Sequence, residues 1–464
     1  MKIALSAVSG TLAICLAVLS AIAGSHSERI NGPFKSGPEV TKACLACHEK
    51  QARDFMKTAH WTWSEEQNVK GTKRAVGKKD VINNFCIALP GNWARCTSCH
   101  AGYGWKDGSF DFSKAENVDC LICHDTTGTY KKFPTGAGHP VYEGEVKEFP
   151  KGKPWQPTDL LNIAKNVGKP NRAACGSCHF YGGGGDHIKH GDLDSSMTNP
   201  TPATDVHMGK GMTCQSCHKT KDHAISGDSL LVSQGEGMRV QCQDCHKNDL
   251  HKNTLLNKHA KRVACQTCHI PAIAKALPTK VWWDWSKAGL EMAEIPKDRF
   301  GEKTYDKMKG EFRWDKDFSP SYYWYNGKVE RLLPGDKFDT GKPAALNAPI
   351  GNRKDPDSLI TPFKVMRGKQ PYDKGKGYMA YVQLFGPQGY WTTYDWNKSI
   401  TNGMNAAGLP YSGQYDFVET SMVWKVNHMV APKDKALKCA DCHGKPGRFN
   451  WQELGYSADP RKSP

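Results

Sequence analysis

Short amphipathic segments, broken by glycine and proline, dominate the first 270 residues. Apolar side chains recur at helical spacing in residues 41–56 and 257–267, a pattern typical of helices that bury one face. The residues between such segments have no sustained period, which indicates loops. We therefore expect short helices connected by loops in this half of the chain.

Residues 270–438 have a different pattern, in which aromatic clusters alternate with glycine and proline. The clusters lie at residues 282–285, 322–325 and 390–396. They predict long loops with a few strands and short helices that wrap a core. A surface on which single-stranded nucleic acid stacks is the alternative.

The composition is that of a folded chain. Of the 464 residues, 38% are hydrophobic, 10% aromatic and 24% charged, which argues against intrinsic disorder. Beyond the N-terminus no segment is apolar and long enough to cross a bilayer, so transmembrane channels and transporters are excluded.

Residues 1–23 have the pattern of a secretory signal peptide. One early lysine, Lys2, precedes an apolar run over residues 3–19, and Ala21-Ile22-Ala23 supplies small residues before Gly24. This pattern predicts cleavage and export to the periplasm, with loss of Cys15. An uncleaved membrane anchor is the alternative.

Sixteen of the eighteen cysteines fall into eight Cys-x-x-Cys-His frames, numbered here as motifs 1 to 8 in chain order. Their cysteine pairs are Cys44 and Cys47, Cys96 and Cys99, Cys120 and Cys123, Cys175 and Cys178, Cys214 and Cys217, Cys242 and Cys245, Cys265 and Cys268, and Cys439 and Cys442. Their histidines are His48, His100, His124, His179, His218, His246, His269 and His443.

This frame is the attachment motif of c-type haem. The two thiols bind one porphyrin covalently, and the following histidine binds its iron. Zinc sites and redox dithiols use paired cysteines but do not require a histidine directly after them. The sequence therefore predicts eight covalently bound c-type haems.

The remaining histidines are candidates for the second axial ligand of each iron, since an electron-transfer haem usually has two. We expect His26, just after the signal peptide, to be disordered, and His139 and His187 to lie at the surface or behind a ligand. Seven good candidates then remain for eight haems, so one haem should have a different ligand and a site for chemistry. The candidates are His60, His190, His207, His223, His251, His259 and His428.

The spacing of the motifs predicts the organisation of the chain. Motifs 1 to 7 lie between residues 44 and 269, whereas motif 8 is at residue 439. We expect a haem-dense domain at 24–270, with seven haems including the catalytic one. An aromatic-rich segment at 271–464 should wrap this domain and return to the eighth haem. The predicted fold is a multihaem cytochrome c of short α-helices and loops around a haem stack, with little β-structure.

Haem also changes the meaning of the basic charge. The formal net charge is +16, which by itself would suggest nucleic acid or an anionic surface as partner. Eight haems with their propionates contribute roughly −8 oxidised or −16 reduced on the same formal counting. The excess of lysine and arginine is then mostly counter-charge, and we expect no nucleic-acid partner.

Several segments around the motifs resemble the octahaem tetrathionate reductases of the bacterial periplasm. They are Asn84-Phe-Cys86-Ile87, Arg95 to Trp105, Asn117 to Asp125, Val167 to Pro170, and the glycine run at 182–185 that leads to Lys189-His190-Gly-Asp-Leu193. The resemblance covers about residues 40–270. Pentahaem nitrite reductases and their octahaem relatives fit less well, because none of the eight motifs ends in lysine.

The resemblance implies three site residues. In that family a lysine amine replaces the distal histidine of the second haem, and the matching residue is Lys189. Asp186 would orient this amine, and Cys86 matches a lone cysteine near the catalytic haem. Without the resemblance, Lys189 would be expected to be a solvated surface lysine. Cys86 would be expected to be a buried thiol, which is usually inert.

The implied activity is reduction of tetrathionate to two thiosulfates by two-electron cleavage of the S–S bond, with nitrite or hydroxylamine as possible further substrates. The expected partners are this small inorganic anion and, as electron donor, a membrane quinol-oxidising multihaem cytochrome. The alternative is a non-catalytic electron carrier between such a donor and a terminal reductase. It predicts an eighth histidine ligand, from His139 or His187.

Overall fold

Short helices carry all eight motifs in the computed structural model, which describes residues 25–69, 71–227, 239–247 and 249–462. The predicted signal peptide and Cys15 lie outside the described residues. The motif-bearing elements are α3 (Gly37–Phe55), α5 (Trp93–Cys96) with the 3-10 helix η2 (Thr97–Cys99), α6 (Leu121–His124), α8 (Arg172–His179), α9 (Cys214–Cys217), the 3-10 helix η6 (Cys242–Asp244), α11 (Cys265–His269) and α14 (Cys439–His443).

Local capping explains where the longer of these helices begin. The side chain of Ser36 accepts a hydrogen bond from the amide of Glu39 at the start of α3, and Asn171 caps α8 through the amide of Ala174. Such caps satisfy amides that have no partner within the helix. The further α-helices are α2 (His26–Arg29), α4 (Ala59–Thr62), α7 (Leu160–Lys165), α10 (Thr254–His259), α12 (Tyr390–Thr393) and α13 (Trp396–Ala406).

A mixed eight-stranded sheet is the main departure from the predicted fold, and the expectation of little β-structure is wrong. Six strands follow the order β12-β16-β14-β7-β9-β8, and β10 and β15 also pair with β14. The strands are β7 (Thr279–Asp284), β8 (Tyr305–Asp306), β9 (Gly310–Asp315), β10 (Ser321–Tyr325), β12 (Ala344–Ala345), β14 (Leu359–Asp373), β15 (Tyr378–Met379) and β16 (Tyr415–Lys425).

The long strand β14 is central to this sheet. Its sequence explains why the hydrophobic pattern did not predict the sheet. It runs antiparallel to β16 and parallel to β7. Pro362 and Pro371 interrupt its sequence, and the polar side chains of Lys364 and Gln370 are buried. A strand without alternation and with internal prolines is not recognised by a period of two.

Four two-stranded sheets complete the secondary structure. They are β1 (Glu65–Val69) with β2 (Thr72–Val76), β3 (Lys147–Glu148) with β4 (Pro154–Trp155), β5 (Thr220–Lys221) with β6 (Ala224–Ile225), and β11 (Lys328–Arg331) with β13 (Asn347–Ile350).

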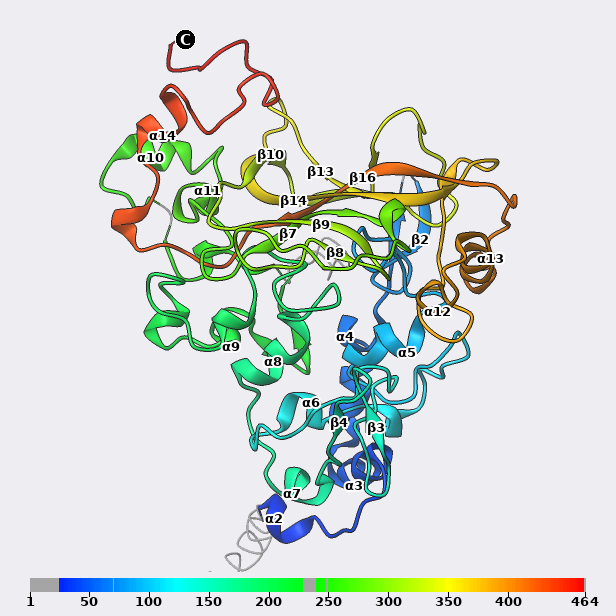
Figure 1. Ribbon diagram of the computed structural model, residues 1–464. Coiled ribbons are helices and arrows are strands. Elements are labelled where there is room, and N and C mark those ends of the chain that lie inside the picture. Colours follow the sequence, from blue (N-terminus) through cyan, green and yellow to red (C-terminus); the bar gives the residue numbers. More distant parts are fainter. Residues whose placement is uncertain (1–24, 70, 228–238, 248, 463–464) are drawn as a thin grey trace, which may run out of the picture.

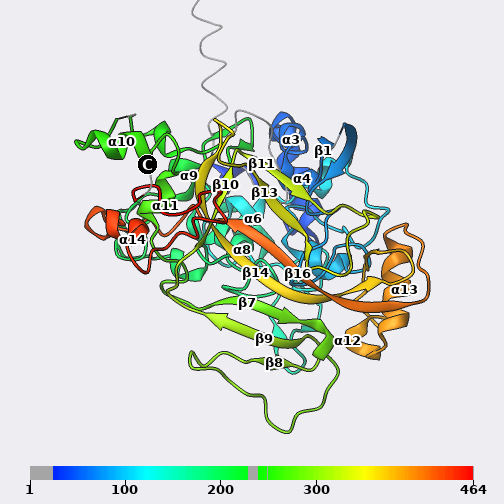
Figure 2. The same cartoon turned by 90° about the horizontal axis from the view of Figure 1, so that it is seen from above.

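The sheet forms the broad end of the molecule, and the helices of motifs 1 to 5 extend from it toward α2 and α7 (Figure 1). Seen from above, β14 and β16 cross the molecule beside β7 and β9, with α12 and α13 at one end (Figure 2). The largest hydrophobic cluster joins Trp283, Met366 and Trp424 of the sheet to Phe85 and Ile87. The segment that contains Cys86 is therefore packed into the core of the sheet.

None of the helices in the described part of the chain is long and apolar enough to cross a membrane.

Candidate haem centres and catalytic site

Seven motif histidines each lie opposite one other histidine. An iron bound between two imidazoles, with each nitrogen about 2 Å away, separates the ring centres by about 6 Å. The observed separations match this value: His48–His26 5.9 Å, His179–His60 6.1 Å, His124–His223 6.4 Å, His246–His207 6.1 Å, His218–His428 6.3 Å, His269–His251 6.2 Å and His443–His259 6.3 Å.

The cysteines and the space around them also fit haem. All seventeen described cysteines are free, so no motif forms a disulfide. No group of three or more His, Cys, Asp or Glu in the described ranges could hold a metal ion by itself. A cavity of about 3740 Å³ is lined by thiols from motifs 1 to 7. The residues therefore fit covalent haems, seven of them between two histidines, and do not fit zinc.

Hydrogen bonds fix the ring orientation of several of these ligands. The Nδ1 atoms of His124 and His218 lie 2.8 Å from the backbone oxygens of Gly168 and Ser226. The Nδ1 atom of His443 lies 2.6 Å from Oδ1 of Asp459. A contact at Nδ1 leaves Nε2 free to bind metal, as is usual for histidine ligands.

The structure changes one member of the predicted distal set. His26 faces His48, whereas His190 packs against Trp424 at 5.4 Å and faces no motif histidine among the described residues. A sequence signal accompanies His26, since Ser25 and Glu28 form a capping box that begins α2. The region after the predicted cleavage site is thus ordered.

His100 of motif 2 is the exception among the motif histidines. Its ring is fully buried between Trp61, Trp63 and Trp105, with centroid distances of 4.9 to 5.3 Å. Its Nε2 atom lies 2.7 Å from the backbone oxygen of Trp61, and its Nδ1 atom has no hydrogen-bond partner. In this arrangement Nε2 of His100 contacts a carbonyl and does not face a second histidine within the described part of the chain.

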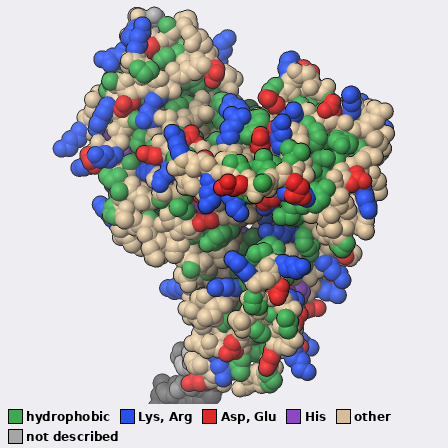
Figure 3. Space-filling model, in the orientation of Figure 1, with side chains coloured by type: hydrophobic (Ala, Val, Ile, Leu, Met, Phe, Trp, Pro, Cys, Tyr) green, Lys and Arg blue, Asp and Glu red, His purple; other side chains and the backbone are tan. Residues whose placement is uncertain are grey.

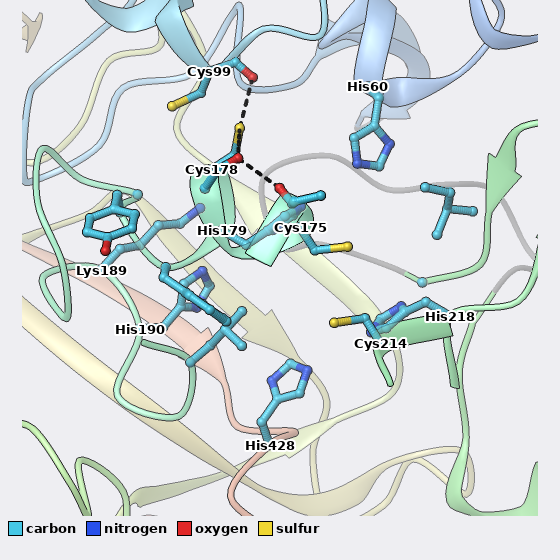
Figure 4. A pocket seen from close by; sticks show the side chains of 18 of the residues that line it. His60, Cys99, Cys175, Cys178, His179, Lys189, His190, Cys214, His218 and His428 are labelled. Carbon is cyan, nitrogen blue, oxygen red and sulfur yellow. Dashed lines mark hydrogen bonds between the residues drawn. The ribbon is translucent and has the colours of Figure 1, made fainter. Parts of the chain in front are cut away.

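Lys189 lies near motif 2 and provides an alternative ligand. Its side chain lines the cavity (Figure 4). Its amine lies 4.6 Å from the ring centre of Trp424. Burial lowers the pKa of this amine to about 7, and nearby Lys78 acts in the same direction. A neutral amine has a lone pair and can bind a metal, whereas a protonated amine cannot.

The sheet fixes the backbone of this segment through two buried side chains. The Nζ atom of Lys364 in β14 donates to the backbone oxygens of Ile188 at 2.9 Å and of Lys189 at 3.0 Å. The hydroxyl of Thr279 in β7 lies 2.7 Å from the oxygen of His187 and 2.9 Å from that of His190. Four consecutive carbonyls, residues 187 to 190, are thereby held by two adjacent strands, which the sequence did not reveal.

The same strand positions the segment that contains Cys86. Asn84 donates from its amide to the Met366 oxygen at 2.7 Å, and Gln370 donates to the Asn83 oxygen at 2.8 Å. Gly368 permits the close pairing of β14 with β7, since a Cβ atom there would lie 2.7 Å from the Trp283 oxygen. Strand β14 therefore places both Cys86 and Lys189.

The glycine run at 182–185 separates Cys86 from Lys189. A Cβ atom on Gly184 would lie 3.1 Å from Sγ of Cys86, and one on Gly182 would lie 3.1 Å from Cδ of Lys189. Gly184 also has φ +95°, a conformation that favours glycine. The run is thus a close approach of backbone to two candidate site residues.

The other predicted site residues have different surroundings. Asp186 accepts a hydrogen bond from the amide of Ser195 at 3.0 Å, so its carboxylate holds backbone rather than the amine of Lys189. His139 contacts the Tyr142 hydroxyl at 2.7 Å, and His187 contacts the Pro278 oxygen at 2.6 Å. The structure places neither histidine opposite a motif histidine.

Cysteine thiols of different motifs lie close enough to interact with one another. Hydrogen-bonded thiol pairs join motif 1 to 3, motif 2 to 4, motif 4 to 5 and motif 6 to 7. Between motifs 3 and 4, 5 and 6, and 7 and 8 the thiols interact electrostatically without a hydrogen bond. Motifs 1, 3, 4, 5, 6, 7 and 8 form a chain, and motif 2 branches from motif 4.

These centres define a multihaem c-type cytochrome, and comparisons with known proteins agree. A family model described as bacterial cytochrome c matches residues 280–446, and one described as cytochrome c554 and c-prime matches residues 43–125. The crystal structure of an octahaem cytochrome c from Shewanella oneidensis is similar, with 49% identity and a TM-score of 0.88. The match covers 95% of this chain and 98% of that one. The chain belongs to the octahaem cytochrome c family.

Two further relatives are more distant. An uncharacterised protein of Archaeoglobus fulgidus is 27% identical over 246 residues, which is 44% of this chain and 81% of the relative. The dissimilatory sulfite reductase MccA of Wolinella succinogenes is 22% identical over 285 residues, which is 54% of this chain. The match spans 36% of the length of that sulfite reductase.

Proposed function

We propose that the chain carries eight c-type haems and reduces a small oxyanion of sulfur at the haem of Cys96 and Cys99. Tetrathionate is the main proposed substrate. The observation that carries this proposal is the asymmetry of the ligands: seven motif histidines face a second histidine, whereas His100 is turned into an aromatic pocket. Two strong histidine ligands suit electron transfer, and a weaker ligand set suits chemistry.

Lys189 is the proposed axial ligand of this haem. Its amine is close enough to Cys99 for the two groups to interact electrostatically, and burial favours its neutral form. Lys364 and Thr279 hold its backbone, so the amine is presented from a fixed segment. A haem bound there would supply the two electrons that convert one tetrathionate dianion, by cleavage of its central S–S bond, to two thiosulfate dianions.

Cys86 is proposed to contact the substrate as a neutral thiol. Burial raises the pKa of this thiol, although the cations Lys309, Arg95, Lys280 and Lys78 oppose that effect. Nucleophilic attack on a disulfide requires a thiolate, so the raised pKa favours contact over covalent catalysis.

The chain of motifs supplies a route for electrons. Electrons that enter at either end, near motif 1 or motif 8, reach motif 4, from which motif 2 branches through Cys178 and Cys99. We propose a membrane quinol-oxidising cytochrome as donor and the periplasm as the compartment, in keeping with the N-terminal sequence.

Reoxidation of the reduced holoprotein tests the activity. The haems are reduced with a limiting amount of dithionite, and their absorbance is followed after addition of tetrathionate, nitrite, hydroxylamine or sulfite. We expect tetrathionate to reoxidise all haems with two thiosulfates formed per two electrons. Sulfite is included because one relative is a sulfite reductase. Failure of all four substrates would favour the electron carrier.

A further inference from the structure

A buried lysine without a partner lines the cavity beside Cys86. Lys280, in β7, is 3% exposed. Within the described residues its amine forms neither a hydrogen bond nor an ion pair. Burying an unpaired amine costs free energy, so such a group requires an explanation other than stability.

Aromatic rings hold this amine in place. Its Nζ atom lies 3.2 Å from the ring centre of Phe312, 4.0 Å from that of Trp283 and 4.8 Å from that of Trp314. Rings stabilise a cation through their faces but accept no strong hydrogen bond. The donors of the amine therefore remain available to a ligand in the cavity.

The surroundings of Cys86 are cationic. The charged groups that act on its thiol are Lys309, Arg95, Lys280 and Lys78. Lys309 already pairs with Asp306 at 3.1 Å, and Arg95 donates to the Pro134 oxygen at 3.0 Å. Lys280 is the member of this group with unused donors that is also buried. Space-filling atoms show further Lys and Arg side chains where the broad end of the molecule meets the narrow one (Figure 3).

The geometry points to a binding subsite for a sulfur oxyanion at Lys280, in the cationic surroundings of Cys86. The amine of Lys280 is the group that would recognise the anionic substrate, and this inference rests on the proposed function. Burial lowers the pKa of Lys280, and an anion beside the amine favours the charged form again. Substrate binding thus compensates the cost of burying the amine.

Haem propionates are the competing partner for Lys280. Propionates are also anionic, and a lysine that served one of them would tune that haem without touching substrate. Lys280 and Cys86 line the same cavity and interact electrostatically, and Cys86 is a thiol outside the attachment motifs, which favours the substrate.

Sulfate binding to the oxidised holoprotein, measured by calorimetry, distinguishes these roles without a need for turnover. Lys280→Met keeps the shape of the side chain and removes its charge, and Lys280→Arg keeps the charge. Lys287→Met is the matched control, because Lys287 lies on the same segment, is exposed and changes the net charge equally. We expect Lys280→Met to weaken sulfate binding about tenfold or more, the size of one lost charged contact, while Lys280→Arg and Lys287→Met stay within about threefold of the wild type.

Turnover gives a second measurement. Lys280→Met should raise KM for the dianion tetrathionate and leave KM for uncharged hydroxylamine unchanged, and its unfolding temperature should not fall. Unchanged sulfate affinity in Lys280→Met overturns the inference, as does an equal loss in Lys280→Arg or absence of sulfate binding in the wild type. Sulfate binding that depends on Lys280 in a protein inert to tetrathionate leaves the subsite standing and removes the proposed activity.

Discussion

The amine of Lys364 lies 3.0 Å from the carbonyl oxygen of Lys189 and donates a hydrogen bond to it. This hydrogen bond joins two lysines that are distant in sequence: Lys364 in the sheet and Lys189, the candidate haem ligand. The same amine donates to the hydroxyl of Thr279 at 2.6 Å. Two strands of the sheet therefore hold the backbone of the segment that contains Lys189.

Thr279→Val should loosen this segment, because it removes the hydroxyl and preserves the side-chain shape. The carbonyls of His187 and His190 would lose the hydroxyl proton that they share and Lys364 would lose an acceptor, at a cost of about 1–3 kcal/mol in the free energy of unfolding. Chemical denaturation measures this loss, and activity should fall further than stability alone explains. Thr279→Ser keeps the hydroxyl and is the control; an equal loss in both variants would refute the role of the hydrogen bonds.

His26→Ala should open the haem of motif 1, since His26 faces His48 at 5.9 Å. The oxidised protein should gain one high-spin haem, visible by electron paramagnetic resonance. His190→Ala is the matched test, because the sequence predicted this residue as a ligand and the structure does not. The assignment fails if His190→Ala produces the high-spin signal and His26→Ala does not.

Asp192→Asn should raise the reduction potential of the haem of motif 5. The carboxylate of Asp192 accepts hydrogen bonds from the amides of Asn427 and His428 and lies 3.3 Å from Nδ1 of His428. A carboxylate at Nδ1 makes the imidazole more electron-donating and favours oxidised iron. Spectroelectrochemical titration should show one shifted centre.

Asp459→Asn provides the control for this prediction, because Asp459 is paired with His443 in the same way. In Asp459→Asn the reduction potential of the haem of motif 8 should rise, and that of the haem of motif 5 should stay unchanged. Identical shifts in the two variants would show a general charge effect and exclude a local one.

Gly184→Ala should impair the catalytic site through contact with Cys86. The added Cβ atom would lie 3.1 Å from the Cys86 sulfur, in a backbone conformation with φ +95°. Gly211 has the same φ and nothing within 4 Å of its Cβ position, so Gly211→Ala isolates the backbone strain. Reoxidation rates should fall more in Gly184→Ala; equal rates would mean that the contact has no consequence.

The sequence predicted the chemistry of the haem sites better than the scaffold that holds them. The attachment frame is local, so spacing alone indicates haem, and the excess of one haem over good ligand candidates pointed to an unusual centre. The sheet was missed because β14 contains prolines and buries Lys364 and Gln370, which bind the loops of Lys189 and Cys86. These contacts join residues far apart in the chain, and no local pattern reveals them.

The choice of His190 over His26 has a similar origin. His190 stands next to Lys189 in a glycine-rich segment that resembles a ligand loop, whereas His26 follows a predicted cleavage site. The burial of His100 among three tryptophans is also a tertiary effect, since the motif itself is intact.

The central claim is that one haem differs from seven others and that Lys189 is its axial ligand. Electron paramagnetic resonance and near-infrared magnetic circular dichroism of the oxidised holoprotein, compared between wild type and Lys189→Ala, test it most directly. We predict seven bis-histidine centres in both proteins and one lysine-ligated centre in the wild type that becomes high-spin in the variant. Eight bis-histidine centres in the wild type, unchanged in Lys189→Ala, would contradict the claim.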